Sequence, residues 1–195
     1  MIKVGITGGI GSGKSTICKV FRVLGIPVFE SDGVARQLMN SDPEMCAQLV
    51  ELFGASVYLP NQLIDRKYLA GIVFSNPSLL AQLNGIVHPK VREVFAAWCK
   101  NQHSAYVLHE SAILFESGFY KLMDKTITVI ANENERIERV IKRDGATEEL
   151  VNQRIRNQWS DIERIKLADF VIGNNEDELI IPQIIEIDKK LRANG

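Results

Sequence analysis

Residues Gly8–Ser15 carry the clearest chemical signal in the sequence. They read GGIGSGKS and fit the pattern G-x-x-x-x-G-K-[ST], which wraps the phosphates of a nucleotide. Glycines let the backbone approach a phosphate closely and turn several N–H groups inward. Lys14 can reach the outer phosphates, and the Ser15 hydroxyl is a hard oxygen ligand that suits Mg²⁺. The pattern predicts a triphosphate site with Mg²⁺ at Ser15, formed by Gly9, Ile10, Gly11, Ser12, Gly13, Lys14, Ser15 and Thr16.

The segments on either side of this motif have the context that it requires. Residues 2–7 alternate apolar and polar side chains and predict a strand, and residues 15–24 place four apolar side chains on one helical face. A helix that begins near Gly13 adds free N–H groups and the positive end of its dipole. This context disfavours an accidental match in a glycine-rich turn.

A second group of polar residues, FESDGVAR (29–36), lies at the end of the next predicted strand, 26–30. Ligands of open α/β sheets bind at the carboxyl ends of the strands, so we expect Asp32 across from the phosphate loop. There its carboxylate would accept or orient the proton of a hydroxyl that attacks the γ-phosphate. Asp32 is equally placed to be a helix N-cap, and the spacing leaves both roles open. Arg36, on the same helical face, is either a phosphate ligand or a salt-bridge partner.

The elements that must position these residues alternate along the chain. Further strands are predicted over 105–110, 125–131 and 169–174, and helices over 133–143, 147–158 and 176–192. Such alternation is typical of a parallel sheet covered by helices on both faces, here the three-layer P-loop α/β fold. The last residues, KKLRANG (189–195), are expected to fray.

Residues 32–102 depart from this alternation. Their apolar residues recur at helical spacing without a clear strand, and pairs such as Asn76-Pro77 interrupt the pattern. His88-Pro89 is predicted to start a helix with Pro89 in its first position. We interpret residues 32–102 as a helical, substrate-binding insert within a single domain, 1–195.

The composition narrows the classes of function. It is ordinary for a globular protein, with 46% hydrophobic and 24% charged residues, and the net charge of −1 does not indicate a broad nucleic-acid-binding surface. No apolar run approaches the length of a membrane span, and MIKVGITGG lacks the layout of a signal peptide. The scattered Cys18, Cys46 and Cys99 make no metal-type pair and are expected to be buried or half-buried thiols in a reducing cytoplasm. A monomer is expected, with a small oligomer left open.

The chain resembles the dephospho-coenzyme A kinase family over essentially its whole length. The motifs that carry the resemblance are, in order, TGGIGSGKS (7–15), Glu30, Asp32 and Arg36, His88-Pro89 with Arg92, AILFE (112–116), Arg139 with Arg143-Asp144, Arg154 with Gln158, and Ala168–Asn174. Many families share the first motif, but the combination in this order is more specific. The departures are Glu30 and Glu110 where aspartate is usual, Ala112 where proline is usual, and Arg136 where glutamine is frequent.

The resemblance implies transfer of the γ-phosphate of ATP to the ribose 3′-hydroxyl of dephospho-CoA, which gives CoA and ADP. It implies catalytic roles for Lys14, Asp32, Arg139 and Arg143, with a helical lid over residues 143–163. Asn174, after the last strand, is placed for the adenine of ATP. The acceptor would be bound by Asp32, Arg36, His88, Arg92 and Glu116.

Several of these residues have structural alternatives. Arg136, Arg139 and Arg143 make a basic stripe of the kind that is usually a solvated, salt-bridged surface. Asn174 could equally be a turn residue. Glu110 could hold a Mg²⁺-bound water or cap the following segment. The remaining histidines and the tryptophans are expected to be structural, surface or domain-contact residues, namely His103, His109, Trp98 and Trp159.

The sequence disfavours three other classes of nucleotide-binding protein. A GTPase switch is disfavoured because the sequence has no D-x-x-G and no N-K-x-D. A shikimate-type or nucleoside monophosphate kinase shares the phosphate loop, but the sequence lacks a three-glycine substrate loop and its insert is long. A regulatory module that binds ATP without turnover is disfavoured by Asp32 and the lid arginines.

Overall fold

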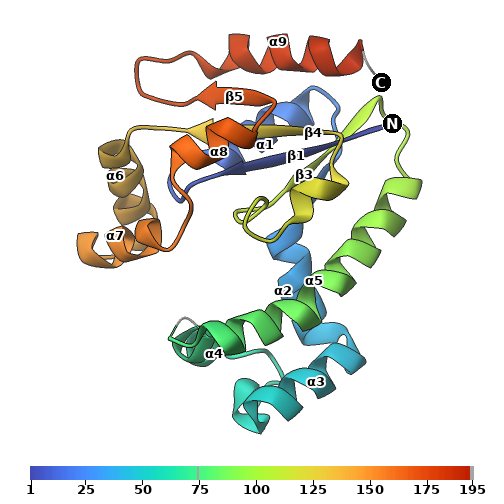
Figure 1. Cartoon of the computed structure of the whole chain (residues 1–195), viewed down its shortest axis with the longest axis vertical. Coiled ribbons are helices and arrows are strands. Elements are labelled where there is room, and N and C mark those ends of the chain that lie inside the picture. The colour runs from blue at the N-terminus through green and yellow to red at the C-terminus, as the bar shows by residue number, and fades with distance from the viewer. Residues whose placement is uncertain (74, 194–195) are drawn as a thin grey trace. The chain divides into compact units, whose positions relative to one another are not determined.

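A five-stranded parallel sheet carries the phosphate-loop motif (Figure 1). The computed structural model describes residues 1–73 and 75–193. Its strands are β1 (Ile2–Gly8), β2 (Val28–Glu30), β3 (Tyr106–Glu110), β4 (Lys125–Ile130) and β5 (Phe170–Gly173). They lie in the order β2-β3-β1-β4-β5, and every neighbouring pair is parallel. The predicted parallel α/β sheet is therefore confirmed, with β1 at its centre.

Helices cover the sheet and complete its core. α1 (Lys14–Val23) and α9 (Ile180–Arg192) pack against each other and against the strands. α8 (Asp161–Leu167) packs on β4. Burial on both faces explains why β3 reads as a continuous buried run rather than an alternating one. The core joins side chains from β1, α1, β3, β4, β5 and α9, including Val4, Ile6, Ile17, Phe21, Leu108, Ile127, Val129, Ile172 and Ile184.

A helical hairpin follows β4. It consists of α6 (Glu133–Asp144) and α7 (Glu148–Arg156), which pack on each other (Figure 1). Gly145 ends α6 in a left-handed conformation, with φ of 64°. The sequence interpretation missed α8, although Ser160 and Glu163 form the capping box that would have signalled it.

Residues 31–101 form a separate compact unit of helices. Its elements are α2 (Ser31–Ser41), α3 (Pro43–Phe53), the 3₁₀ turn η1 (Ala55–Val57), α4 (Arg66–Val73) and α5 (Pro77–Lys100). α5 packs against α2, α3 and α4. Asp42 and Asn76 cap α3 and α5 from the positions before Pro43 and Pro77, as expected for X-Pro pairs that begin helices.

The prediction that His88-Pro89 starts a helix is wrong. α5 begins at Pro77 and runs on to Lys100, so Pro89 lies in its interior. Proline there removes one backbone donor from the helix. The helix continues because Leu83, Val87, Val91 and Phe95 keep one apolar face buried across the interruption. Tertiary packing has overridden the local breaker.

The end of the chain is more ordered than predicted. The expected fraying of residues 189–195 is wrong for Lys189–Arg192, which lie in α9. Leu191 is buried, and Arg192 donates to Asp188 and to the carbonyl oxygen of Leu24. Asn194 and Gly195 lie outside the described residues. Among the residues that are described, no helix has both the length and the apolar character needed to cross a membrane.

Candidate active site

The phosphate loop connects the end of β1 to the start of α1. Gly11 and Gly13 have φ of 78° and 88°, the left-handed region that only glycine enters without strain. Side chains also leave no room for a Cβ, since one at Gly13 would overlap the amide of Asn174. The first N–H groups of α1 have no acceptor within the helix and lie where the positive end of the helix dipole adds to them. The motif therefore has the backbone shape of an anion-binding loop.

The outer side of the loop packs directly on α6. The guanidinium of Arg136 occupies the space that a Cβ at Gly9 would need, and the Arg136 backbone occupies the space beside Gly11. Arg136 is 5% exposed, so it does not belong to a solvated basic stripe. Glycines in this loop thus serve packing against a helix as well as approach to phosphate.

Lys14 pairs with Glu110 at the end of β3. The pair is nearly covered, with side chains 11% and 10% exposed. The pairing of β1 with β3 explains this contact, because Glu110 lies beside Ile6 of β1, just before the loop. The sequence left the role of Glu110 open, and the structure brings it to the motif lysine. A carboxylate at this point holds the ammonium group at the carboxyl edge of the sheet.

Asn174 follows β5 and closes the other side of the loop. Its side-chain amide donates to the carbonyl oxygen of Ser12 at 2.8 Å. Arg139 donates to the carbonyl oxygen of Asn174 at 2.9 Å and to Glu135 at 2.7 Å. The structure therefore brings Asn174 and Arg139 to the phosphate loop, one through direct contact and the other through Asn174.

Arg143 is placed differently from Arg139. Its side chain is 63% exposed, and its guanidinium donates to both carboxylate oxygens of Asp144 at 2.7 and 2.9 Å. The hydrogen bond from Arg143 lowers the pKa of Asp144. No hydrogen bond joins Arg143 to the phosphate loop among the described residues. The i, i+4 spacing put the two arginines on one face, but only Arg139 reaches the loop after β5.

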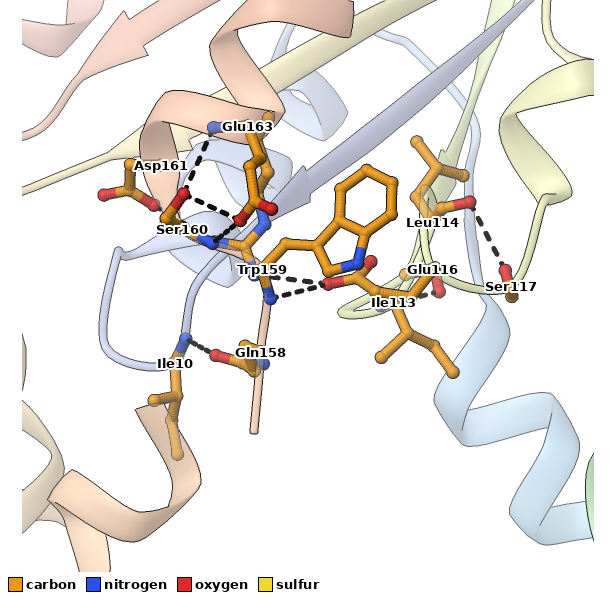
Figure 2. Close-up of polar contacts among 12 residues, drawn as sticks. Ile10, Ile113, Leu114, Glu116, Ser117, Gln158, Trp159, Ser160, Asp161 and Glu163 are labelled. Carbon is orange, nitrogen blue, oxygen red and sulfur yellow. Dashed lines mark hydrogen bonds and ion pairs between the residues drawn. The ribbon is translucent and has the colours of Figure 1, made fainter. Parts of the chain in front are cut away.

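Glu116 lies in the segment after β3 and faces the turn between α7 and α8 (Figure 2). Its Oε1 accepts from the backbone N–H of Trp159 and from Arg164, both at 3.4 Å. Arg164 is fully buried and also donates to Asp161 at 3.1 Å. Trp159 stacks on Phe115 with ring centroids 6.2 Å apart. The predicted substrate residue Glu116 thus belongs to a charged network that holds α8.

The other predicted acceptor residues belong to the helical unit. Asp32 lies in the first turn of α2, which begins at Ser31, so the alternative that it is the N-cap is wrong. Arg36 follows one turn later on the same face of α2. His88 and Arg92 are also one turn apart, on α5. Burial, followed by the charge of Arg92, lowers the pKa of His88.

The hydroxyl oxygen of Ser15, next to Lys14, suits Mg²⁺ bound together with a nucleotide. Ser15 lies in the first turn of α1 with an exposed side chain. The described residues contain no group of three His, Cys, Asp or Glu side chains that would hold a metal by themselves. Mg²⁺ usually keeps several waters and uses few protein ligands beside the phosphates. The residues present therefore fit a metal that arrives with its nucleotide.

His109, expected to be a structural or surface residue, is a core residue. It has no exposed surface, and its ring stacks on those of Phe119 and Phe29, with ring centroids 4.2 and 5.5 Å apart. Burial lowers its pKa to about 4. Of the cysteines, Cys18 and Cys99 are buried and Cys46 is half-buried, all as free thiols. Burial raises the pKa of Cys18 to about 11.

Comparisons with known proteins show the family to which the chain belongs. Residues 2–179 match the dephospho-CoA kinase family, CoaE. The chain is 41% identical to the dephospho-CoA kinase of Bacteroides fragilis over 187 residues, which cover 95% of this chain and 91% of that one. It is also 41% identical to the dephospho-CoA kinase of Porphyromonas gingivalis over 194 residues, 99% of this chain and 96% of that one. The solved structure of TT1252 from Thermus thermophilus superposes with a TM-score of 0.85, at 33% identity, and covers 99% of this chain and 97% of that one. With its phosphate loop, parallel sheet and helical unit, the chain belongs to the dephospho-CoA kinase family.

Proposed function

We propose that this chain transfers the γ-phosphate of ATP to the ribose 3′-hydroxyl of dephospho-CoA. As a member of its family, the chain is a kinase that phosphorylates dephospho-CoA to CoA at the expense of ATP. The observation that carries the proposal is the glycine-shaped loop between β1 and α1, with Lys14 held at the carboxyl edge of the sheet. Phosphoryl transfer depends mainly on positioning and on neutralising charge, and this loop supplies both.

In this proposal Lys14 leaves Glu110 to bind the β- and γ-phosphates when ATP enters. The residues from Gly9 to Thr16 surround the phosphates, and Asn174 lies beside the adenine. Ser15 would hold Mg²⁺, which neutralises charge on the phosphates when it is bound. Each of these residues lies within the loop or contacts it directly.

Asp32 is the proposed residue that orients the acceptor. It follows Glu30, the last residue of β2, by two positions in the chain, and this short separation supports the proposal. Its carboxylate would accept a hydrogen bond from the 3′-hydroxyl as that hydroxyl attacks phosphorus. Arg36, His88, Arg92 and Glu116 are the proposed contacts to the rest of dephospho-CoA.

Arg139 and Arg143 are the proposed arginines of a lid over residues 143–163. Arg139 is already tied to the loop after β5, whereas exposed Arg143 can turn from Asp144 towards the γ-phosphate if the lid closes. We also propose that the chain acts as a monomer in the cytoplasm, where its free thiols stay reduced. Size-exclusion chromatography with light scattering tests the monomer.

The test is ADP release from Mg·ATP with dephospho-CoA, shikimate, AMP or CMP as acceptor. Rapid turnover is expected with dephospho-CoA alone, and ³¹P NMR of the product should place the new phosphate on the 3′-oxygen. Lys14→Ala should nearly abolish turnover in a folded chain. ATP binding without ADP release from any acceptor would instead support a regulatory module, and transfer to shikimate would favour the rival kinase class.

A further inference from the structure

Ile10 is the third residue of the phosphate-loop motif. Its backbone N–H, its carbonyl oxygen and its side chain all contact α6, α7 or the turn that follows α7. Its N–H donates to the side-chain oxygen of Gln158 at 2.8 Å (Figure 2). Its carbonyl oxygen accepts from Arg136 Nε at 2.9 Å. Its side chain packs on the apolar cluster of the hairpin, which includes Ile137, Val140 and Val151. The hairpin and the turn that follows it thus contact Ile10 through its N–H, its carbonyl oxygen and its side chain.

Arg136 is itself fixed in place. Its side chain is 6% exposed, and its Nη1 donates to Asp161 at 3.2 Å. Asp161 begins α8 and also accepts from the fully buried Arg164. A guanidinium enclosed in this way would be costly to move, because it would leave a buried charge without its partner. The contact to Ile10 therefore comes from a rigid part of the fold.

These contacts to Ile10 would fix the shape of the loop. A flexible, glycine-rich segment loses much conformational entropy when it takes one shape. The hydrogen bonds with Gln158 and Arg136 fix the orientation of the two peptide groups on either side of Ile10. Ile10 lies within the turn in which the N–H of Ser12 donates to the carbonyl oxygen of Gly9. A loop that already has its bound shape does not pay this ordering cost when the phosphates arrive.

We propose that Gln158 and Arg136 are positioning residues for the phosphates of ATP and that they act through Ile10. Neither is expected to touch the reacting atoms. The inference rests on the phosphate loop being the ATP site, as proposed above, and adds which residues outside the motif give the loop its affinity. It also links the loop to the hairpin that carries Arg139.

The test measures binding and not turnover. Isothermal titration of the full chain with ADP and with inorganic tripolyphosphate compares Gln158→Met with wild type. Methionine keeps the length of the side chain but lacks the acceptor for Ile10. Loss of one hydrogen bond that shapes the loop should raise Kd for both ligands about 3- to 10-fold. Gln153→Met, an exposed position on α7 with the same chemistry, is the matched control and should bind both ligands as wild type does.

A second pair of variants repeats the test from the other bond. Arg136→Met should weaken both ligands by a similar factor, Arg136→Lys should recover part of the loss, and Arg156→Met on exposed α7 surface is the control. If Arg136→Met fails to fold, Gln158→Met still decides, because it removes no charge. Unchanged tripolyphosphate affinity in Gln158→Met would overturn the inference, as would an equal loss in Gln153→Met. A chain that binds both ligands but does not phosphorylate dephospho-CoA would contradict the proposed function and leave this inference standing.

Discussion

Side chains from four separate segments contact the phosphate loop of this chain. Glu110 holds Lys14, Asn174 holds Ser12, and Arg136 and Gln158 hold Ile10. Under the proposed function, the motif contains the groups that would contact phosphate, whereas the side chains that contact the motif come from β3, α6, the turn after α7 and the end of β5. Under the proposed function, a substitution outside the motif should therefore also weaken nucleotide binding.

Asp32→Asn should lower kcat far more than it changes ATP binding. If the carboxylate orients the attacking hydroxyl, its loss should cost about 10²–10⁴-fold in rate. As a purely structural residue in the first turn of α2, Asp32 would contribute about 0.3–1 kcal/mol through the helix dipole and leave the chemistry intact. Measurements of kcat, of Kd for ATP and of thermal stability on the same variant separate the two roles.

Arg143→Ala should slow phosphoryl transfer with little change in Kd for ATP. The side chain lies exposed beside Asp144, so any contact to the γ-phosphate must form on closure and appear mainly in the transition state. Lysine should rescue only partly, since it lacks the planar pair of donors. Single-turnover kinetics at saturating Mg·ATP and dephospho-CoA measure the step. An unchanged rate would mean that Arg143 forms only a surface ion pair, and Arg139 would then be the arginine to test.

His109 should make the folded chain less stable in acid. Burial sets its pKa to about 4 in the folded chain, against about 6.5 when unfolded, so the unfolded state binds more protons between these values. Stability should fall as pH drops from about 6.5 to 4, by up to about 3 kcal/mol from this residue. Urea unfolding across that range measures the slope. His109→Phe, which keeps the ring stack, should flatten it, and His103→Asn on exposed surface should not.

α5 shows how one element can contain a breaker and persist. Its apolar positions, Leu83, Val87, Val91 and Phe95, are buried on both sides of Pro89. A helix in a protein gains most of its stability from such a face rather than from local propensity. The backbone hydrogen bond that Pro89 cannot donate thus destabilises α5 locally, and the buried apolar face stabilises the helix as a whole.

Pro89→Ala should raise the free energy of unfolding of the helical unit by about 1–3 kcal/mol. Alanine restores the backbone donor and relieves the ring from the carbonyl oxygen four residues earlier. The greater freedom of the unfolded chain offsets part of the gain, by about 0.4–1 kcal/mol. Pro77→Ala, at the first position of α5, is the control and should change stability by less than about 1 kcal/mol. Urea denaturation of both variants compares the effects, and an equal response would contradict this account of Pro89.

The whole chain divides its work between two compact units. The sheet unit contains the phosphate loop together with Glu110, Arg136, Gln158 and Asn174, and the helical unit, 31–101, contains Asp32, Arg36, His88 and Arg92. Under the proposed function, the first binds the donor and the second binds most of the acceptor. Each ligand should therefore leave its own footprint on the chain.

Hydrogen exchange can read these footprints. ADP with Mg²⁺ should protect amides of the phosphate loop and of the start of α1, because their N–H groups then gain phosphate acceptors. Amides of α2 and α5 should gain protection only when dephospho-CoA is added. Mass spectrometry of peptides after timed exchange measures both effects. Equal protection of α2 and α5 by ADP alone would contradict the proposed division between donor and acceptor.

The sequence by itself determined the class of site, the sheet and the family resemblance. A phosphate loop is local, since eight consecutive residues contain its glycines, lysine and hydroxyl, so the linear pattern suffices. Strands buried on both faces are likewise visible as short runs rich in apolar and β-branched residues, and helices with one apolar face are visible as periodicity. The capping box at Ser160 and Glu163 was also present in the sequence and would have revealed α8.

Only the tertiary structure decided which distant residues serve the loop. Ile10 and Gln158 are 148 residues apart, and Lys14 and Glu110 are 96 apart. No periodicity connects such pairs, because they meet through the order of strands in the sheet and the packing of a hairpin on a loop. The same holds for Arg136, which has charged neighbours along α6 but is buried against glycines that lack the side chains to exclude it. Local chemistry is written in consecutive residues, whereas burial and partnership arise only when the folded chain brings remote segments together.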